Sequence, residues 1–283
     1  MHIERVGVVG AGQMGNGIAH VAALSGHQVT LYDIAQPQLD KARATIERNL
    51  ARQVRKELVT RSDADAALAR IRWTTTIEDL GSTELVVEAA TEKVGLKFEI
   101  FGKLSAVTPA HTILASNTSS ISITAIAAHT NRPDKVVGMH FMNPVPVMKL
   151  VELIRGLPTS DETFTAVEAA AQRMGKTTVE ARDMPGFLVN RVLMPYINEA
   201  VFALYEGIGS VEDIDTAMKL GTNVPMGPLQ LADFIGLDTC HAIMEVLRDG
   251  LGGDSKYRPC PLLRKYVEAG WLGRKAGRGF YTY

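Results

Sequence analysis

Over the first two thirds of the chain, short apolar runs rich in β-branched residues alternate with stretches of helical periodicity. Several of these runs, such as Val6–Val9, are apolar throughout, which is typical of strands covered on both faces. Alternation of strands with helices predicts a parallel sheet with crossover helices. The predicted strands are Val6–Val9, Gln28–Tyr32, Ile71–Thr75, Leu85–Glu88, Thr112–Ala115, Lys135–Phe141, Lys149–Ile154 and Lys176–Glu180.

Two of these strands are joined by too few residues for a crossover helix. A short segment around Asn-Pro-Val-Pro separates Lys135–Phe141 from Lys149–Ile154. Parallel neighbours need a connection of about a dozen residues or more, so this pair is predicted to run antiparallel.

From about Asp183 onward, helical periodicity replaces the strand pattern. Pro and Gly interrupt regular structure, so Met184-Pro185-Gly186 marks the predicted boundary between a domain of residues 1–184 and one of residues 185–283. The predicted fold class is α/β, a Rossmann-type, doubly wound, mostly parallel sheet followed by an all-helical C-terminal domain. The helices predicted in the second domain are Leu188–Tyr205, Val211–Leu220, Leu229–Arg248 and Pro261–Ala269.

Composition narrows the class of protein. A net charge of −1 argues against a surface built for nucleic acid or an anionic membrane. No apolar run reaches the roughly 18 residues of a membrane span, and the chain enters its first strand pattern without a signal peptide. Cys240 and Cys260 fit no zinc or redox spacing, so we expect two reduced thiols in a cytoplasmic protein.

The first strand leads into Gly10-Ala11-Gly12-Gln13-Met14-Gly15, and a helical pattern follows to about Ser25. In this motif Gly10 permits a tight turn, Gly12 lets the backbone approach a pyrophosphate, and Gly15 lets helix and strand pack closely. The N-terminus of the helix then offers N–H groups to the phosphates. Strand, glycines and helix in this order predict a dinucleotide site.

Asp33 stands 18 residues after Gly15, at the end of the next predicted strand. Its carboxylate can accept hydrogen bonds from both hydroxyls of an adenosine ribose and would repel a 2′-phosphate. No Arg follows it closely. The sequence therefore predicts NAD rather than NADP.

The segment from Lys41 to Arg61 is strongly basic, with seven cations against Glu47 and Glu57, a charge of 7 − 2 = +5. It is predicted as one amphipathic helix with an apolar stripe. Two interpretations stay open, a solvated charged face or a docking surface for substrate phosphates. The apolar stripe consists of Leu39, Ala42, Ile46, Leu50 and Val54.

Two polar residues interrupt apolar strands. His140 lies near the end of one strand and Glu152 lies within the next. A buried carboxylate is costly unless it is paired, so Glu152 is predicted to hydrogen-bond one imidazole nitrogen of His140. The other nitrogen can then move a proton while hydride moves to NAD. A satisfied core histidine is the alternative.

Further polar candidates lie at the end of the Thr112–Ala115 strand and after the domain boundary. A hydroxyl in Asn117-Thr118-Ser119-Ser120 can hold a substrate oxygen, although these residues can equally cap the next helix. Asn190 lies on an otherwise apolar helix. We find no metal signature, no nucleophile elbow and no second phosphate loop, which argues against hydrolase and kinase chemistry.

Together these features resemble the L-3-hydroxyacyl-CoA dehydrogenase family, and most closely its short bacterial members that act on 3-hydroxybutyryl-CoA. The resemblance covers essentially the whole chain. It is carried by Gly10–Gly15, Val86–Ala89, Ser116–Ser120, His140–Val145, Met148–Glu152, Asp183–Arg191, Gly221–Asn223, Gly227-Pro228 and Gly277–Tyr281.

The resemblance implies reversible oxidation of the C3 hydroxyl of an (S)-3-hydroxyacyl-CoA by NAD, giving a 3-oxoacyl-CoA such as acetoacetyl-CoA. It implies His140 as catalytic base oriented by Glu152, with Ser119 and Asn190 at the substrate or nicotinamide. It also implies a homodimer assembled through the helical domain. The residues expected at the cofactor are Gly10, Gly12, Gln13, Met14, Gly15, Asp33, Glu92, Lys97, Asn143 and Lys275.

The CoA-contacting helix of the family matches the basic segment, with Asn49, Arg52 and Lys56 as the expected contacts. The family often carries Ser where Asn49 stands. The pathway stays open, because butanoate fermentation, polyhydroxyalkanoate metabolism, fatty-acid oxidation and aromatic-acid degradation could all employ such an enzyme. Acyl chain length and physiological direction stay open.

Two rival interpretations remain. A sugar-acid or carnitine-type NAD dehydrogenase of the same superfamily would share the cofactor motif and the Ser–His–Glu–Asn set, but would not need the basic segment. A crystallin-like structural protein would share the fold without activity, and the retained Ser119, His140, Glu152 and Asn190 argue against it.

Overall fold

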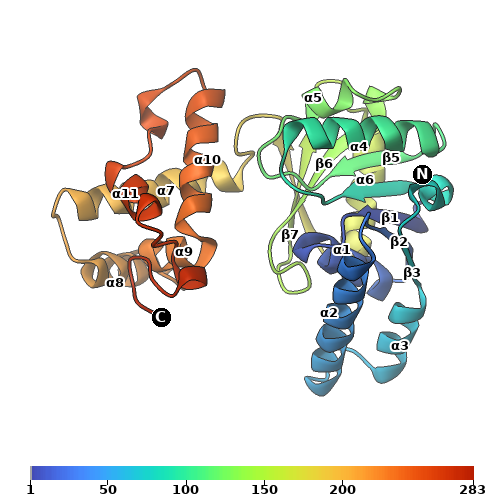
Figure 1. The fold of residues 1–283 in the computed structure, drawn as a ribbon, viewed down its shortest axis with the longest axis horizontal. Helices are drawn as coiled ribbons and strands as arrows, with labels where there is room; N and C mark the ends of the chain where they lie inside the picture. Colours follow the sequence, from blue (N-terminus) through green and yellow to red (C-terminus); the bar gives the residue numbers. More distant parts are fainter. Residues whose placement is uncertain (1) are drawn as a thin grey trace. The chain divides into compact units, whose positions relative to one another are not determined.

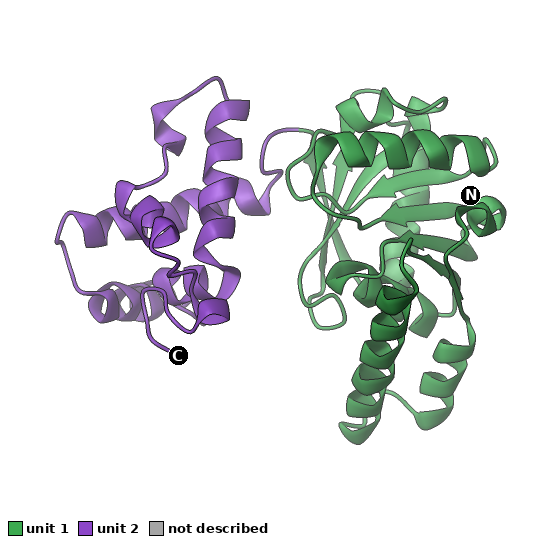
Figure 2. Ribbon diagram, viewed as in Figure 1, with its two compact units in different colours: residues 1–183 green, residues 184–283 purple. Residues whose placement is uncertain are grey.

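The computed structural model describes residues 2–283, which form two compact units, Met1–Asp183 and Met184–Tyr283 (Figure 2). Each unit has its own hydrophobic core. The junction expected at Met184-Pro185-Gly186 falls on the first residues of unit 2.

Unit 1 is built on one eight-stranded sheet in the order β3-β2-β1-β4-β5-β6-β7-β8 (Figure 1). The eight predicted strands are confirmed, with bounds that shift by at most two residues. Every neighbouring pair is parallel except β6 and β7, which confirms the predicted antiparallel pair. The strands are β1 (Arg5–Val9), β2 (Gln28–Tyr32), β3 (Ile71–Thr74), β4 (Leu85–Glu88), β5 (Ile113–Ser116), β6 (Val136–Phe141), β7 (Leu150–Arg155) and β8 (Thr177–Arg182).

Helices cover both faces of this sheet. One face forms the larger core with residues of α1, α2, α3 and α6. The other face packs against α5, because a Cβ on Gly138 of β6 would lie 3.1 Å from Ile123 of that helix. The helices of unit 1 are α1 (Gln13–Leu24), α2 (Gln36–Arg55), α3 (Arg61–Ala69), α4 (Val94–Val107), α5 (Ile123–Ala127) and α6 (Asp161–Arg173), with 3-10 turns η1 (Ile77–Ser82) and η2 (Pro133–Lys135).

Strand alternation decides which face each side chain joins. On β6, Val137, Met139 and Phe141 belong to the larger core. His140 therefore lies on the opposite face, the side of Gly138 and α5. The same alternation places Glu152 of β7 there, between Val151 and Leu153 of the larger core.

The predicted single helix from Lys41 to Arg61 is wrong in its extent. α2 ends at Arg55, and Arg61 opens α3. Glu57 has a left-handed backbone (φ 56°), which an α-helix cannot continue. Thr60 then caps α3, since its side chain accepts a hydrogen bond from the backbone N–H of Asp63. The apolar stripe is confirmed for Leu39, Ala42, Ile46 and Leu50, which are buried, while Val54 is partly buried.

Unit 2 is helical throughout its described length, apart from short turns. Three of its four predicted helices are confirmed within two residues, but Leu229–Arg248 is two helices. Gly236 separates them with φ 106°, a backbone conformation that L-residues with side chains rarely adopt. The elements are α7 (Val189–Tyr205), α8 (Val211–Thr222), α9 (Pro228–Ile235), α10 (Leu237–Gly250), η3 (Ser255–Tyr257), α11 (Pro261–Glu268) and η4 (Arg274–Ala276).

Two buried aspartates tie the end of the chain to unit 2. Asp215 accepts a hydrogen bond from the Tyr281 hydroxyl at 2.8 Å. Asp233 accepts the backbone N–H groups of Phe280 and Tyr281, both at 2.9 Å. The last residues are thereby part of the fold of this unit.

Within residues 2–283, no helix combines the length and the apolar character needed to cross a membrane.

Candidate active site

The strand order of unit 1 reverses direction between β1 and β4. In open α/β sheets the crevice for a ligand lies at such a switch point, beyond the carboxyl ends of the strands. β1, β4, β5 and β6 are parallel, so their carboxyl ends share this edge. The start of β7 joins them because it runs antiparallel to β6.

The glycine-rich loop after β1 has the geometry that a dinucleotide needs. Gly10 has φ 95°, and a Cβ there would lie 2.8 Å from the carbonyl oxygen of Ala89. A Cβ on Gly15 would lie 1.7 Å from the carbonyl oxygen of Gly10, so only glycine fits. Gly12 has open space, and no side chain caps the N-terminus of α1. The backbone N–H groups of this end fit a pyrophosphate.

Asp33 follows β2 directly and is fixed by two backbone groups. Its Oδ2 accepts the N–H of Ala11 at 2.8 Å, and its Oδ1 accepts the N–H of Ala35 at 3.0 Å. The carboxylate is thus held against the glycine-rich loop, which is the position that ribose recognition requires.

Asn143, after β6, is brought to the same loop. The Gln13 side chain donates to the Asn143 Oδ1 at 3.0 Å. The segment that follows is held by Lys176, whose ammonium donates to the carbonyl oxygens of Val145 (2.5 Å) and Met148 (2.9 Å). Burial lowers the pKa of Lys176.

His140 and Glu152 are direct cross-strand partners on β6 and β7. His140 Nδ1 lies 2.7 Å from Glu152 Oε2, and the Glu152 side chain is fully buried. The hydrogen bond predicted from the two polar interruptions is therefore present. It presents a rigid imidazole at the edge where the cofactor loop opens.

The turn after β5 does not cap the following helix. Ser122 caps α5 by accepting the N–H of Ala125 at 3.1 Å. Ser119 instead contacts Glu92, with its N–H at 2.8 Å and its hydroxyl at 3.2 Å from Oε1. Of the two open interpretations, helix capping is excluded for Ser119. Asn117 joins this turn to β6, because its Oδ1 accepts the N–H of Phe141 at 2.9 Å.

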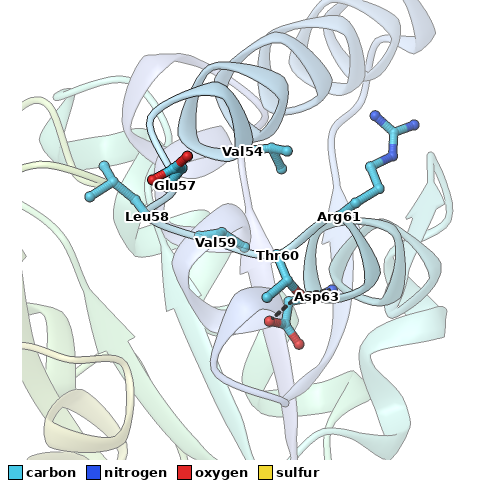
Figure 3. A pocket seen from close by; sticks show the side chains of 7 residues that line it. All are labelled: Val54, Glu57, Leu58, Val59, Thr60, Arg61 and Asp63. Atoms are coloured by element: carbon cyan, nitrogen blue, oxygen red, sulfur yellow. Dashed lines mark hydrogen bonds between the residues drawn. The ribbon is translucent and has the colours of Figure 1, made fainter.

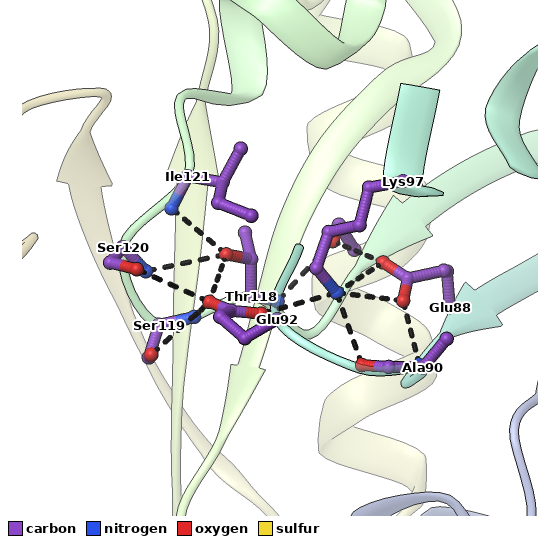
Figure 4. A network of polar contacts seen from close by, with 9 residues as sticks. Glu88, Ala90, Glu92, Lys97, Thr118, Ser119, Ser120 and Ile121 are labelled. Atoms are coloured by element: carbon purple, nitrogen blue, oxygen red, sulfur yellow. Dashed lines mark hydrogen bonds and ion pairs between the residues drawn. The ribbon is translucent and has the colours of Figure 1, made fainter. Parts of the chain in front are cut away.

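Glu92 and Lys97, expected only from the resemblance, belong to a partly buried polar network (Figure 4). Burial alone would raise the pKa of Glu92, but the Lys97 ammonium and the hydrogen bonds from Thr118 and Ser119 outweigh it and hold that pKa below its usual value. Glu88, at the end of β4, is the third charged member. Residue-level reasoning missed Glu88, although it is a carboxylate on an apolar strand like Glu152.

The exposed face of α2, together with the C-cap residue Lys56, carries cations without carboxylate partners. Arg43 pairs with Glu47 and Arg61 with Asp65. In residues 2–283, no carboxylate lies within ion-pair distance of Arg48, Arg52 or Lys56. Arg52 donates to the Asn49 Oδ1 at 3.0 Å, so two of the expected CoA contacts adjoin each other.

A pocket of about 420 Å³ lies where α2 turns into α3 (Figure 3). Its lining includes one cation, Arg61, and two carboxylates, Glu57 and Asp63. This balance of charge does not suit a phosphate, so the exposed face of α2 is the better phosphate surface. The lining residues are Val54, Glu57, Leu58, Val59, Thr60, Arg61 and Asp63.

The remaining expected site residues belong to unit 2. Asn190 is the second residue of α7 and is buried. Lys275, in η4, forms an ion pair with Asp238 at 2.6 Å. Within residues 2–283, no cluster of three or more His, Cys, Asp or Glu side chains has the arrangement of a metal site.

Comparison with known proteins places this chain in a family. The model of the 3-hydroxyacyl-CoA dehydrogenase NAD binding domain matches residues 5–184, and that of the 3-hydroxyacyl-CoA dehydrogenase C-terminal domain matches residues 186–283. A 3-hydroxybutyryl-CoA dehydrogenase of Bradyrhizobium diazoefficiens is 59% identical, covering 99% of this chain and 96% of the relative. A probable 3-hydroxybutyryl-CoA dehydrogenase of Bacillus subtilis is 57% identical, covering 100% and 98%.

The fold agrees with that of a solved relative. The crystal structure of an (S)-3-hydroxybutyryl-CoA dehydrogenase from Ralstonia eutropha superposes with a TM-score of 0.97, at 53% identity and with 99% of each chain covered. The chain therefore belongs to the 3-hydroxyacyl-CoA dehydrogenase family of NAD-dependent oxidoreductases.

Proposed function

We propose that this protein is a 3-hydroxybutyryl-CoA dehydrogenase. It interconverts an (S)-3-hydroxyacyl-CoA and NAD⁺ with a 3-oxoacyl-CoA, NADH and a proton. The observation that carries the proposal is the His140–Glu152 pair, 2.7 Å apart, at the edge of the sheet that holds the NAD loop. The names of the relatives support the substrate.

Proton transfer is assigned to His140. Glu152 engages Nδ1, so it fixes the tautomer and orientation of the ring and stabilises the imidazolium that forms. Nε2 takes the proton of the C3 hydroxyl in oxidation and returns it in reduction. Bound NAD supplies the hydride acceptor.

Cofactor binding is assigned to three groups of residues. Gly10, Gly12 and Gly15 form the turn under the pyrophosphate, with Met14 in the first turn of α1. Asp33 binds the adenosine ribose. We assign Gln13, Asn143, Glu92, Lys97 and Lys275 to the rest of the cofactor.

Substrate binding is assigned to Ser119 and Asn190 at the reacting end and to α2 at the CoA end. Asn49, Arg52 and Lys56 contact the CoA phosphates. The cations of α2 that lack carboxylate partners support this assignment over a sugar-acid or carnitine-type substrate, which carries no such phosphates.

The proposal extends to assembly and setting. Unit 1 is the NAD-binding domain, and unit 2 serves substrate binding and dimerisation in a homodimer. Both cysteines are buried free thiols, which suits a reducing compartment such as the cytoplasm. Butanoate or fatty-acid metabolism is the expected setting.

The test follows NADH absorbance at 340 nm with acetoacetyl-CoA, longer 3-oxoacyl-CoAs and free acetoacetate. We expect rapid oxidation of NADH with acetoacetyl-CoA and a rate at least a hundredfold lower with free acetoacetate, which lacks the phosphates that α2 binds. A protein inactive on every CoA thioester but active on a sugar acid or carnitine would overturn the proposal.

A further inference from the structure

A buried lysine in unit 1 is shared between two carboxylates (Figure 4). The Lys97 side chain is 1% exposed, and its Nζ lies 2.7 and 2.9 Å from the two oxygens of Glu88. The same Nζ lies 3.2 Å from Glu92 Oε2. The ammonium therefore links a fully buried carboxylate to one whose side chain is 39% exposed.

Glu88 is the fixed end of this chain of contacts. It ends β4, and its Oε1 accepts the backbone N–H of Ala90 at 2.7 Å. Its Oε2 accepts the hydroxyl of Ser116, the last residue of β5, at 2.7 Å. With these partners and Lys97, the carboxylate is locked to two central strands of the sheet.

Glu92 is the end that faces the site. Its Oε1 accepts the Thr118 hydroxyl at 2.5 Å and the Ser119 N–H at 2.8 Å. The hydroxyls of Ser119 and Ser120 lie 3.2 and 3.3 Å from the same oxygen. One carboxylate oxygen thus organises the whole turn that carries Ser119.

A purely stabilising role accounts poorly for this arrangement. Burying an ion pair costs desolvation that its attraction often only balances, and apolar side chains of the same size are often as stabilising. A chain of charged groups that leads from the sheet to the Ser119 hydroxyl is better explained by positioning, since misplacement by about 1 Å can cost on the order of 10²-fold in rate.

We infer that Glu88 is a positioning residue, which acts through Lys97 and Glu92 to hold the Ser119 hydroxyl toward the substrate. This inference rests on the proposed function, in which Ser119 contacts the substrate. Glu88 itself touches neither substrate nor cofactor.

The test is a double-mutant cycle of Glu88→Gln and Ser119→Ala, followed with acetoacetyl-CoA and NADH. Gln keeps the size of the side chain but removes its charge, so Lys97 is released toward Glu92. We expect Glu88→Gln alone to lower kcat about 10- to 100-fold. In the Ser119→Ala background it should lower kcat less than threefold, because the group it positions is gone. Losses that multiply fully would overturn the inference.

A matched control separates positioning from stability. Ser105 is a buried serine on α4, the helix that carries Lys97. Its hydroxyl donates to Asn131 Oδ1 at 2.6 Å and lies outside this network. Ser105→Ala should lower the melting temperature while leaving kcat and KM unchanged. If Ser105→Ala lowers kcat as much as Glu88→Gln at an equal loss of stability, the effect is structural and the inference fails.

If the Glu88→Gln protein does not fold, a milder variant tests the same inference. Ser116→Ala removes one hydrogen bond to Glu88 and keeps all three charges. Ser116→Ala should lower kcat several-fold in the wild-type background, and it should leave kcat nearly unchanged in the Ser119→Ala background. If the wild type is active on acetoacetyl-CoA but the kinetics of Ser116→Ala are unchanged, the positioning role alone is overturned. A wild type without activity on acetoacetyl-CoA would instead overturn the proposed function. Fluorescence titration with NADH gives a readout independent of turnover, and saturable binding of NADH to the Glu88→Gln protein shows that its cofactor site is still formed.

Discussion

At the scale of single residues, Asp33 is the clearest determinant of cofactor choice. Its two oxygens already accept the N–H groups of Ala11 and Ala35, so the carboxylate is fixed before a ribose binds. Asp33→Ala should raise KM for NADH and narrow the preference for NADH over NADPH. Steady-state kinetics with both cofactors measure this.

Asp40→Ala is the matched control for that variant, because it removes an exposed carboxylate from the first turns of α2, the helix that follows Asp33. It should leave the cofactor preference unchanged. A wild-type protein with a higher kcat/KM for NADPH than for NADH would contradict the role given to Asp33.

The His140–Glu152 pair supports a second prediction. General-base catalysis is worth about 10² to 10⁴ in rate, so His140→Ala should lose a factor of that order in kcat. Glu152→Gln keeps the size of the side chain but removes the charge that stabilises the imidazolium, and it should also lower kcat strongly. The two losses should not multiply in the double variant, because the residues act as one unit.

The expected readout is kcat in the two single variants and the double variant, with KM and the melting temperature as controls. Glu152 is fully buried, so Glu152→Gln will also lower stability. A folded Glu152→Gln protein with the kcat of the wild type would reduce Glu152 to a core residue.

The residues differ in how far the sequence alone could predict them. His140 and Glu152 interrupt apolar strands, and burial forces such groups to pair, so their contact was predictable. Lys97 is different, because a lysine in a helical pattern indicates a solvated cation. It is buried only because β4 brings Glu88 next to it, and that contact depends on the tertiary structure.

At the scale of elements, periodicity predicted the strands well and the ends of helices less well. The helical pattern continues across Gly236 and across Glu57, where the backbone turns left-handed. Apolar spacing carries no information about that conformation. The basic segment therefore divides between α2 and α3, and its usable face belongs to α2.

The α2 helix supports a prediction about substrate docking. Neutralising Arg52 and Lys56 together, by R52A and K56A, should raise KM for acetoacetyl-CoA about tenfold or more, while KM for NADH stays nearly unchanged. The reason is loss of attraction to the CoA phosphates. The effect should shrink as salt rises, because exposed charges are screened beyond about 8–10 Å at moderate ionic strength.

A double variant with the same loss of charge is the control. Arg43 and Arg61 already pair with Glu47 and Asp65, so R43A with R61A should change KM for acetoacetyl-CoA far less. If the two double variants raise KM for acetoacetyl-CoA equally, the effect comes from the net positive charge of the region rather than from a docking surface. Equal effects on both ligands would indicate damage to the fold.

At the scale of the whole molecule, unit 2 leaves large apolar side chains exposed. Val192 is 71% exposed, Ile208 74% and Leu220 81%. Association of two copies of the chain through part of this surface would bury these side chains. Closed two-fold symmetry is the commonest arrangement for a pair of identical chains. Light scattering at micromolar concentration should give twice the chain mass of 30.7 kDa. A monomer under those conditions would contradict the proposed homodimer.

Folding stability should depend on pH through two buried histidines. His20 is 1% exposed and His27 is fully buried. Burial lowers the pKa of each from 6.5 to about 4, and the nearby cations Lys176 and Arg173 add to the effect. The folded protein therefore keeps both rings neutral at a pH where the unfolded chain has already protonated them.

The sign follows from this difference in bound protons. Between pH 6.5 and about 4 the unfolded state binds more protons, so the free energy of unfolding falls as the pH falls through that window. A shift of this size corresponds to roughly 3 kcal/mol for each ring, at about 1.4 kcal/mol per pKa unit.

Thermal unfolding at pH 7 and pH 4.5 should show a lower melting temperature at the lower pH. The double variant H20Q and H27Q should lose less melting temperature over that interval than the wild type, whereas H111Q, which removes an exposed ring, should behave like the wild type. An identical loss in the double variant and the wild type would assign the acid sensitivity to other groups.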